Sequence, residues 1–220
     1  MSHVPPRSAG DTQFLKPVLE QTRRHLGFEP NSLLTMAHMP HVALAFGLLM
    51  TTVRGGDLRS AWNQIANHVP LPDDAALNVE PALLQLAAFA ASVGAGCRYC
   101  QAHTSHTLEK MMDLPAPKIA DLLRHEQSPH YSPRERAVVA LALAAAQVPN
   151  AAEAKHFAAL REHFTDRQIV QIVAILGLFG FLNRWNDTLA TTLESAPRDF
   201  AQTALESLAW SPGKHQGTCT

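Results

Sequence analysis

Residues 81–104 read PALLQLAAFAASVGAGCRYCQAHT, and this stretch decides the predicted fold. Its first part, 81–93, has the length and the apolar content of a buried helix, and the two glycines that follow are expected to end that helix. Cys97 and Cys100 then fall in the first turn of a second helix. We therefore expect two helices joined by a short break, with a cysteine pair at the break.

The rest of the chain has the same helical character. Apolar residues recur at helical spacing, and the sequence has no series of alternating strands bounded by turn residues. The predicted helices are 12–26, 31–39, 41–53, 60–67, 79–93, 97–112, 117–125, 133–147, 151–163, 166–182 and 184–193. The predicted fold class is all-α. Three helix starts have a capping sequence: Ser132 with Glu135, Asn150 with Glu153, and Thr165 with Gln168.

The sequence predicts one helical domain, residues 12–209, between a flexible N-terminus, 1–11, and a flexible tail, 210–220. A turn-rich stretch divides the domain into candidate halves at 12–127 and 132–209. Gln85 precedes Cys97-Arg98-Tyr99-Cys100 by the same twelve positions that separate Gln171 from Asn183-Arg184-Trp185-Asn186. The halves are either two copies of a unit of helix, break and helix, or alike by coincidence.

The composition limits the partners of the protein. Hydrophobic residues make up 46% of the 220 residues and charged residues 17%, so we expect a homo-oligomer, a dimer or larger. The 18 Lys and Arg balance the 19 Asp and Glu without a basic run, which argues against nucleic acid. The longest apolar run, 169–182, is shorter than the roughly 20 residues of a membrane helix and predicts a buried helix. With no export signal and only three cysteines, a cytoplasmic location is expected.

The cysteine pair has the spacing of a redox centre. The N-terminus of a helix favours a thiolate, and Arg98 adds a positive charge, so we expect a lowered pKa at Cys100. Cys97 and Cys100 lie on adjacent turns and could form a disulfide. His103 lies beside Cys100 on the helix and is the candidate for proton transfer. Thr104, one turn after Cys100, is a candidate to hold a water or a peroxide oxygen.

Two other interpretations of the cysteines are open. Zinc is one, because Cys97, Cys100, His103 and His106 are all ligand types. However, four ligands at successive steps of three residues on one helix cannot surround an ion tetrahedrally. The other interpretation is purely structural, with two small buried thiols.

Three segments together resemble the carboxymuconolactone decarboxylase and alkyl hydroperoxidase D superfamily: 81–93, GCRYCQAHT at 96–104 and FLNRWNDT at 181–188. GFEPN at 27–31 is similar to the early turn of its peroxidase-related members. The resemblance implies an oligomeric helical bundle and a thiol peroxidase without metal or organic cofactor. It also implies that Cys100 attacks the hydroperoxide and becomes a sulfenic acid, and that Cys97 resolves it to a disulfide. A dithiol protein or a small thiol would then reduce the disulfide.

Two positions depart from the superfamily pattern. Its proton relay uses a glutamate twelve residues before the first cysteine and a histidine four residues after the second, where this chain has Gln85 and Thr104. Gln85 cannot accept a proton, and His103 is expected to replace the family histidine. Arg98, Tyr99 and Thr104 complete the predicted site as supporting residues. A thiol peroxidase is the leading interpretation; a disulfide reductase, a catalytically weakened binding protein and a carboxymuconolactone decarboxylase-type enzyme are the alternatives.

Overall fold

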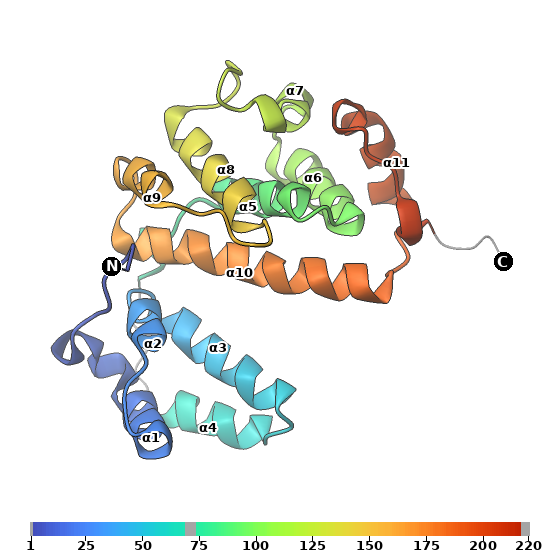
Figure 1. The fold of residues 1–220 in the computed structure, drawn as a ribbon. Helices are drawn as coiled ribbons and strands as arrows, with labels where there is room; N and C mark the ends of the chain where they lie inside the picture. Colours follow the sequence, from blue (N-terminus) through green and yellow to red (C-terminus); the bar gives the residue numbers. More distant parts are fainter. Residues whose placement is uncertain (1, 69–73, 217–220) are drawn as a thin grey trace. The chain divides into compact units, whose positions relative to one another are not determined.

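The computed structural model describes residues 2–68 and 74–216, and the regular elements in these ranges are all helical (Figure 1). The predicted all-α class is confirmed. The α-helices are α1 (Lys16–Leu26), α2 (Asn31–Met36), α3 (Pro40–Val53), α4 (Leu58–His68), α5 (Pro81–Gly94), α6 (Arg98–Met112), α7 (Ala116–Ala120), α8 (Pro133–Ala145), α9 (Ala154–Arg161), α10 (Asp166–Leu189) and α11 (Ser195–Ala204). Five 3₁₀ turns lie at Ala9–Leu15 (η1), Ala75–Leu77 (η2), Leu122–Arg124 (η3), Glu206–Leu208 (η4) and Gly213–His215 (η5).

The described residues form two compact units. The first contains the residues up to Asn78 together with Phe164–Gln171, and the second contains Val79–His163 and the residues from Ile172 onward. The boundary before α5 differs from the candidate halves, which would have met between 127 and 132. That stretch lies inside the second unit, because α5 packs against both α6 and α8 and so holds the two sides of the stretch together.

The first unit has a small apolar core. Leu15 and Leu19 of the N-terminal helical segment are buried there with Ala37, Ala43 and Leu44. Helix α1 ends at Gly27, whose φ of 80° is the left-handed conformation that glycine adopts without a steric penalty.

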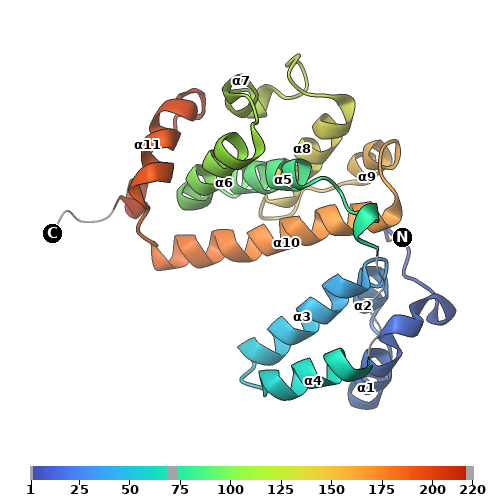
Figure 2. The same ribbon diagram turned by 180° about the vertical axis from the view of Figure 1, so that it is seen from behind.

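The second unit is built around α5. The middle of this helix is fully buried and rich in alanine, so that α6 and α8 can pack closely on it. Figure 2 shows α5, α6 and α8 side by side. At Gly94 an added Cβ would lie 3.0 Å from the carbonyl oxygen of Leu143 in α8, so glycine lets the two helices approach closely here. Gly96, with φ of 73°, then turns the chain into α6, as the sequence predicted.

Two of the three predicted helix caps are confirmed. Ser132 Oγ accepts from the backbone N–H of Glu135, and the Glu135 carboxylate accepts from the Ser132 N–H. Thr165 and Gln168 exchange the same two hydrogen bonds. The prediction for Asn150 was wrong. Helix α9 begins after Glu153, whose N–H donates to His156 Nδ1, whereas Asn150 Oδ1 accepts from Ala152 N–H in the preceding turn.

Helix α10 runs unbroken where the sequence predicted two helices. It continues through Asn183 and Arg184 to Leu189, so the break that a second copy of the cysteine unit would need is not there. By length and composition α10 could span a membrane, and among the described helices it alone has this property. Ile169 and Ile172 of α10 are fully buried, but only 28% of its most apolar 18-residue stretch is buried. The prediction of a buried helix at 169–182 is therefore confirmed only in part.

Both predicted flexible ends contain packed residues. Near the N-terminus Val4 is buried, and Arg7 N–H donates to the carbonyl of Leu34. After α11, Trp210 Nε1 donates to the carbonyl of Arg98 at 3.1 Å, and the carbonyl of His215 accepts from Leu193 N–H at 2.9 Å. The segment 210–216 therefore packs on the beginning of α6 and on the chain after α10. Residues 217–220 lie outside the described residues.

Candidate functional site

The two cysteines lie at the start of α6. Cys97 is the N-cap residue, and its Sγ accepts from the backbone N–H of Cys100 at 3.3 Å. Both are free thiols, and their exposed fractions are only 1% and 4%. The break between α5 and α6 thus places one sulfur on the N-terminus of the helix and the other one turn along it.

The surroundings shift the pKa values of the two thiols in opposite directions. A hydrogen bond from the Cys100 thiol lowers the pKa of Cys97, and the Cys100 backbone N–H and the ammonium of Lys214 lower it further. Burial and the negative charge of Asp187 oppose this, but the net shift is downward. The pKa of Cys100 is raised well above its ordinary value, because its thiol is the donor in that bond and is buried. The predicted lowering at Cys100 was wrong, since the N-terminal N–H of the helix points to the sulfur of Cys97.

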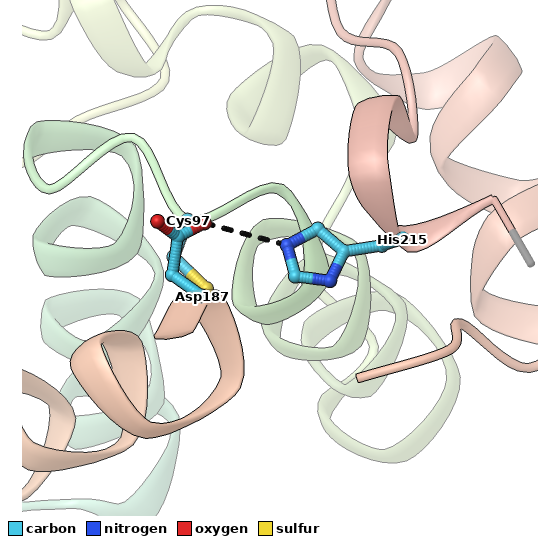
Figure 3. Close-up of side chains that lie close together, drawn as sticks. All are labelled: Cys97, Asp187 and His215. Atoms are coloured by element: carbon cyan, nitrogen blue, oxygen red, sulfur yellow. Dashed lines mark hydrogen bonds and ion pairs between the residues drawn. The ribbon is translucent and has the colours of Figure 1, made fainter. Parts of the chain in front are cut away.

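A buried histidine and a carboxylate face Cys97. The ligand atoms of Cys97, Asp187 and His215 all lie within 4.8 Å of one another, although the residues come from the start of α6, from α10 and from η5 (Figure 3). His215 has an exposed fraction of 0%, and its Nε2 lies 3.4 Å from Asp187 Oδ1. Asp187 Oδ2 also accepts from Lys214 Nζ at 2.8 Å, and this bond lowers the pKa of Asp187.

The backbone fixes the tautomer of His215. Its Nδ1 lies 2.8 Å from the carbonyl oxygen of Thr191, which can only accept, so Nδ1 carries a hydrogen. In the neutral ring Nε2 is then an acceptor, and it lies beside the Asp187 carboxylate and the Cys97 thiol. Nε2 can therefore accept the proton of the Cys97 thiol when the thiolate forms.

The same three side chains are also metal-ligand types. Unlike the set considered from the sequence, they come from three separate elements and converge. The ammonium of Lys214 already occupies one oxygen of Asp187 and would compete with an ion there.

Cys100 has its own hydrogen-bond neighbours. Asn186 Nδ2, from α10, donates to Cys100 Sγ at 3.5 Å. The hydroxyl of Thr104 donates to the carbonyl of Cys100 at 2.6 Å. The Thr104 hydroxyl thus donates its hydrogen within α6, whereas the sequence suggested that this hydroxyl would hold a peroxide oxygen.

His103 makes a hydrogen bond to Glu194, the residue just before α11. His103 Nε2 donates to Glu194 Oε2 at 2.7 Å, and the Tyr99 hydroxyl donates to the other carboxylate oxygen at 3.2 Å. The rings of Tyr99 and His103 also stack, with centroids 4.4 Å apart. Burial and the Glu194 charge raise the pKa of Tyr99 to about 12. Glu194 is exposed; its slight desolvation raises its pKa, but a backbone N–H and His103 bring the pKa below the ordinary value.

Gln85 and Arg98 make contacts within the pair formed by α5 and α6. Gln85 Nε2 donates to the backbone carbonyl of Thr104 at 3.3 Å, and Arg98 pairs with the Gln101 side chain at 3.5 Å. Gln85 therefore binds a backbone carbonyl, and Arg98 binds a side-chain amide. The sequence suggested instead that both side chains act on the cysteine sulfur atoms.

Sequence reasoning missed Asp187 and His215. Asp187 stands in the segment FLNRWNDT, but no role followed from that segment alone. His215 lies in a short turn of the predicted tail, and no local pattern connects it with Cys97. Only the packing of 210–216 brings it to the site.

Comparison with known proteins supports the resemblance. Residues 73–144 match the Carboxymuconolactone decarboxylase family, and no curated protein matches the chain. The debrominase Bmp8 is 29% identical, with a TM-score of 0.55 over 93% of this chain and 97% of that chain. A Bmp8 variant with alanine in place of a cysteine, in complex with 2,3,4-tribromopyrrole, is 28% identical, with a TM-score of 0.56 over 93% and 98%. An uncharacterized peroxidase-related protein from Ralstonia eutropha JMP134, an alkylhydroperoxidase AhpD core, is 23% identical, with a TM-score of 0.44 over 84% and 90%.

Proposed function

We propose that this protein, whose residues 73–144 match the Carboxymuconolactone decarboxylase family, is a thiol-dependent oxidoreductase that reduces hydroperoxides. The observation that carries the proposal is the pairing of Cys97 with Cys100 at the start of α6, beside the buried His215. One sulfur is favoured as a thiolate, the other is held as a thiol, and an imidazole nitrogen that can take up and return a proton lies next to the first. These are the three groups that a dithiol needs to reduce an electrophilic oxygen.

In the first step the Cys97 thiolate attacks the terminal oxygen of the hydroperoxide. A sulfur–oxygen bond forms and the oxygen–oxygen bond breaks. The leaving alkoxide takes from His215 Nε2 the proton that Nε2 accepted from the Cys97 thiol, and becomes an alcohol. Cys97 is now a sulfenic acid. Asp187 stays ionised and positions the imidazole, because its pKa is lowered by Lys214.

In the second step the Cys100 thiol attacks the Cys97 sulfur. A disulfide forms, the sulfur–oxygen bond breaks, and the departing hydroxide takes the Cys100 proton and leaves as water. An external dithiol, a protein or a small thiol, restores the pair and is itself oxidised. In total one hydroperoxide and one dithiol give an alcohol, water and a disulfide. These roles of Cys97 and Cys100 are the reverse of those implied by the superfamily resemblance.

The need for a dithiol reductant also bears on the location of the protein. Thiol reductants are kept reduced in the cytoplasm. We therefore include a cytoplasmic location in the proposal.

The similarity to the debrominase Bmp8 favours a second candidate function, reductive removal of a halogen. The same dithiol would supply the two electrons: a carbon–bromine bond is replaced by carbon–hydrogen, and bromide, one proton and the disulfide are formed. Both candidates use Cys97 as the nucleophile and Cys100 as the resolving thiol.

Thiol counting after oxidation tests the proposal. Cys219 is the third cysteine of the sequence. In a Cys219→Ser background, stoichiometric cumene hydroperoxide should consume both remaining thiols of each chain. Cys100→Ser should then leave a sulfenic acid on Cys97 that dimedone traps, whereas Cys97→Ser should trap none on Cys100. A parallel reaction with brominated pyrroles measures released bromide. Bromide release that matches disulfide formation, without a reaction with the hydroperoxide, would favour the second candidate. Unchanged thiols in both reactions would contradict both.

A further inference from the structure

Three side chains at the thiol site form a candidate site for a metal ion. Cys97, Asp187 and His215 bring a sulfur, a carboxylate oxygen and a ring nitrogen within 4.8 Å of one another (Figure 3). They come from three separate elements and can therefore surround an ion, which four residues along one helix could not do. Zn²⁺ and Co²⁺ accept such a mixed set of ligands, whereas Mg²⁺ and Ca²⁺ prefer oxygen alone. The ligand set favours a thiophilic divalent cation.

The spacing of two of these atoms fits a tetrahedral ion. His215 Nε2 lies 3.4 Å from Asp187 Oδ1. Zinc binds nitrogen and oxygen ligands at about 2.0–2.2 Å, so two such ligands at the tetrahedral angle lie about 3.3–3.5 Å apart. The Cys97 sulfur lies within 4.8 Å of both residues and would need to be about 3.6 Å from each ligand atom. A small side-chain movement thus completes three corners of a tetrahedron, and a water can take the fourth.

The hydrogen bonds of His215 leave the nitrogen that faces the site free for a metal. Nδ1 donates to the carbonyl of Thr191, so the lone pair of the neutral ring is on Nε2. Histidines that bind metals almost always donate their other N–H to a carbonyl, a carboxylate or a water. The backbone of His215 is also fixed, because its carbonyl accepts from Leu193 N–H at 2.9 Å. The ligand nitrogen is therefore oriented before an ion arrives.

The surroundings of Cys97 suit a thiolate that binds a metal. Its Sγ accepts from the Cys100 N–H at 3.3 Å, and a bound thiolate can keep this hydrogen bond. Cys97 and His215 are buried, whereas the side chain of Asp187 has an exposed fraction of 45%. An ion can thus reach the two buried ligands from solvent by way of the carboxylate.

Lys214 limits the affinity of this site. Asp187 Oδ2 accepts from Lys214 Nζ at 2.8 Å, whereas Asp187 Oδ1 lies against His215 Nε2. An ion on Oδ1 would therefore leave the ammonium in place on Oδ2, but the two positive charges would repel each other. Removal of the ammonium should strengthen the binding of a cation.

We propose that the reduced protein binds one Zn²⁺ ion through Cys97 Sγ, Asp187 Oδ1 and His215 Nε2. The ion takes the place of the Cys97 thiol hydrogen, which leaves to solvent as a proton, and no electrons are exchanged. A sulfur bound to zinc is a weaker nucleophile than a free thiolate, so the ion switches the oxidation of Cys97 off. This switch rests on the proposed function, whereas the binding of the ion does not.

Metal titration of the reduced, full-length Cys219→Ser protein tests the site. Competition with a chromophoric chelator should show one Zn²⁺ bound per chain, and excess Mg²⁺ should not displace it. Co²⁺ should give the visible bands of a four-coordinate ion and a charge-transfer band from sulfur to cobalt. Cys97→Ser should remove the charge-transfer band and weaken Zn²⁺ binding at least about tenfold. Asp187→Asn keeps the shape of its side chain and should also weaken binding.

Two further variants separate a metal site from an effect on the fold. His103→Gln changes a histidine of α6 that pairs with Glu194 and should bind Zn²⁺ as the parent protein does. Lys214→Gln should bind Zn²⁺ at least about threefold more tightly, a gain that damage to the fold would not give. Equal affinities of Cys97→Ser and the parent, or weaker binding by Lys214→Gln, would overturn the site. A six-coordinate Co²⁺ spectrum without the sulfur band would also overturn it.

Thiol counting separates this inference from the proposed function. Stoichiometric Zn²⁺ should slow the consumption of both thiols by cumene hydroperoxide at least about tenfold, and EDTA should restore the rate. If Zn²⁺ does not bind while the hydroperoxide still consumes both thiols, the metal site is wrong and the oxidoreductase function stands. If Zn²⁺ binds through the three residues but the metal-free thiols do not react, the site stands and the function is contradicted. Bound Zn²⁺ that leaves the oxidation rate unchanged would overturn the switch.

Discussion

Cys97 and Cys100 are separated by two residues, and different hydrogen bonds act on their two sulfur atoms. Cys97 receives the N–H at the start of α6 and faces His215 and Lys214. Cys100 lies one turn into the helix, donates its own hydrogen to Cys97 and accepts a bond from Asn186. The first cysteine is therefore the better nucleophile at neutral pH, and the second keeps the proton that resolution needs.

This difference predicts the order in which the thiols ionise. In the Cys219→Ser protein the first thiolate should appear below the ordinary midpoint of about 8.5, and iodoacetamide should modify Cys97 first. Lys214→Gln removes a favourable charge and should move this midpoint up. Because the pKa of Cys97 is lower in the folded protein, its thiolate adds stability above the ordinary midpoint, and that contribution is lost as the pH falls through the folded value. Ultraviolet thiolate absorbance and peptide mass mapping check this, and first modification at Cys100 would contradict it.

The sequence located the cysteine pair but not the residues that act on it. The spacing of Cys97 and Cys100 and the glycines before them were enough to predict a helix start. Which sulfur receives the first N–H depends on the φ and ψ of Cys97, which spacing does not determine. His103 was chosen because it is close in sequence, yet Glu194 at the start of α11 pairs with it. His215 acts from a distant turn that only tertiary packing brings near.

At the scale of helices, Gln85 connects α5 with α6. Its amide donates to the carbonyl of Thr104, and the Thr104 hydroxyl donates to the carbonyl of Cys100. The position that carries a glutamate in the superfamily pattern is thus used here to hold two helices together, and a neutral donor suits a carbonyl partner.

Gln85→Glu is therefore expected to lower the free energy of unfolding without raising the oxidation rate of the cysteines. A carboxylate has no hydrogen to donate and would face the Thr104 carbonyl, which should cost about 1–3 kcal/mol of unfolding free energy at neutral pH. This repulsion raises the pKa of the new carboxyl, so the loss should shrink in acid, where the protonated form can donate. Denaturant unfolding at neutral and acidic pH measures it, with the exposed Gln202→Glu as control. A rise of several-fold in the oxidation rate of the cysteines would instead support the proton relay of the superfamily.

Helices were predicted well where the sequence carries its own start signal, as at Ser132 and Thr165. The continuity of α10 was missed because Asn183 and Arg184 look like a break. Both fit into the helix, where Asn183 donates to the carbonyl of Ala91 and Arg184 donates to the carbonyl of Gly180. Helix α11 was also missed. Pro197 lies in its first turn, where a missing N–H costs no helical hydrogen bond.

At the scale of the whole molecule, large apolar side chains are exposed on the second half of α10. They are Leu178, Phe181, Trp185 and Leu189, and the rings of Phe181 and Trp185 stack with centroids 5.8 Å apart. A hollow of about 620 Å³ lies over this part of the helix. Exposed apolar surfaces of this kind mark contacts with other proteins.

We propose that a second copy of the chain covers this surface, in line with the 46% hydrophobic composition. Light scattering at micromolar concentration should then give a dimer or a larger assembly. Trp185→Glu places a charge in the centre of the surface and should weaken assembly at least tenfold, because a charge buried there without a partner is costly. Met111→Glu changes an exposed apolar residue on α6 and should leave the mass of the assembly, as measured by light scattering, unchanged. A monomeric parent protein, or equal masses for Trp185→Glu and the parent, would refute this interface.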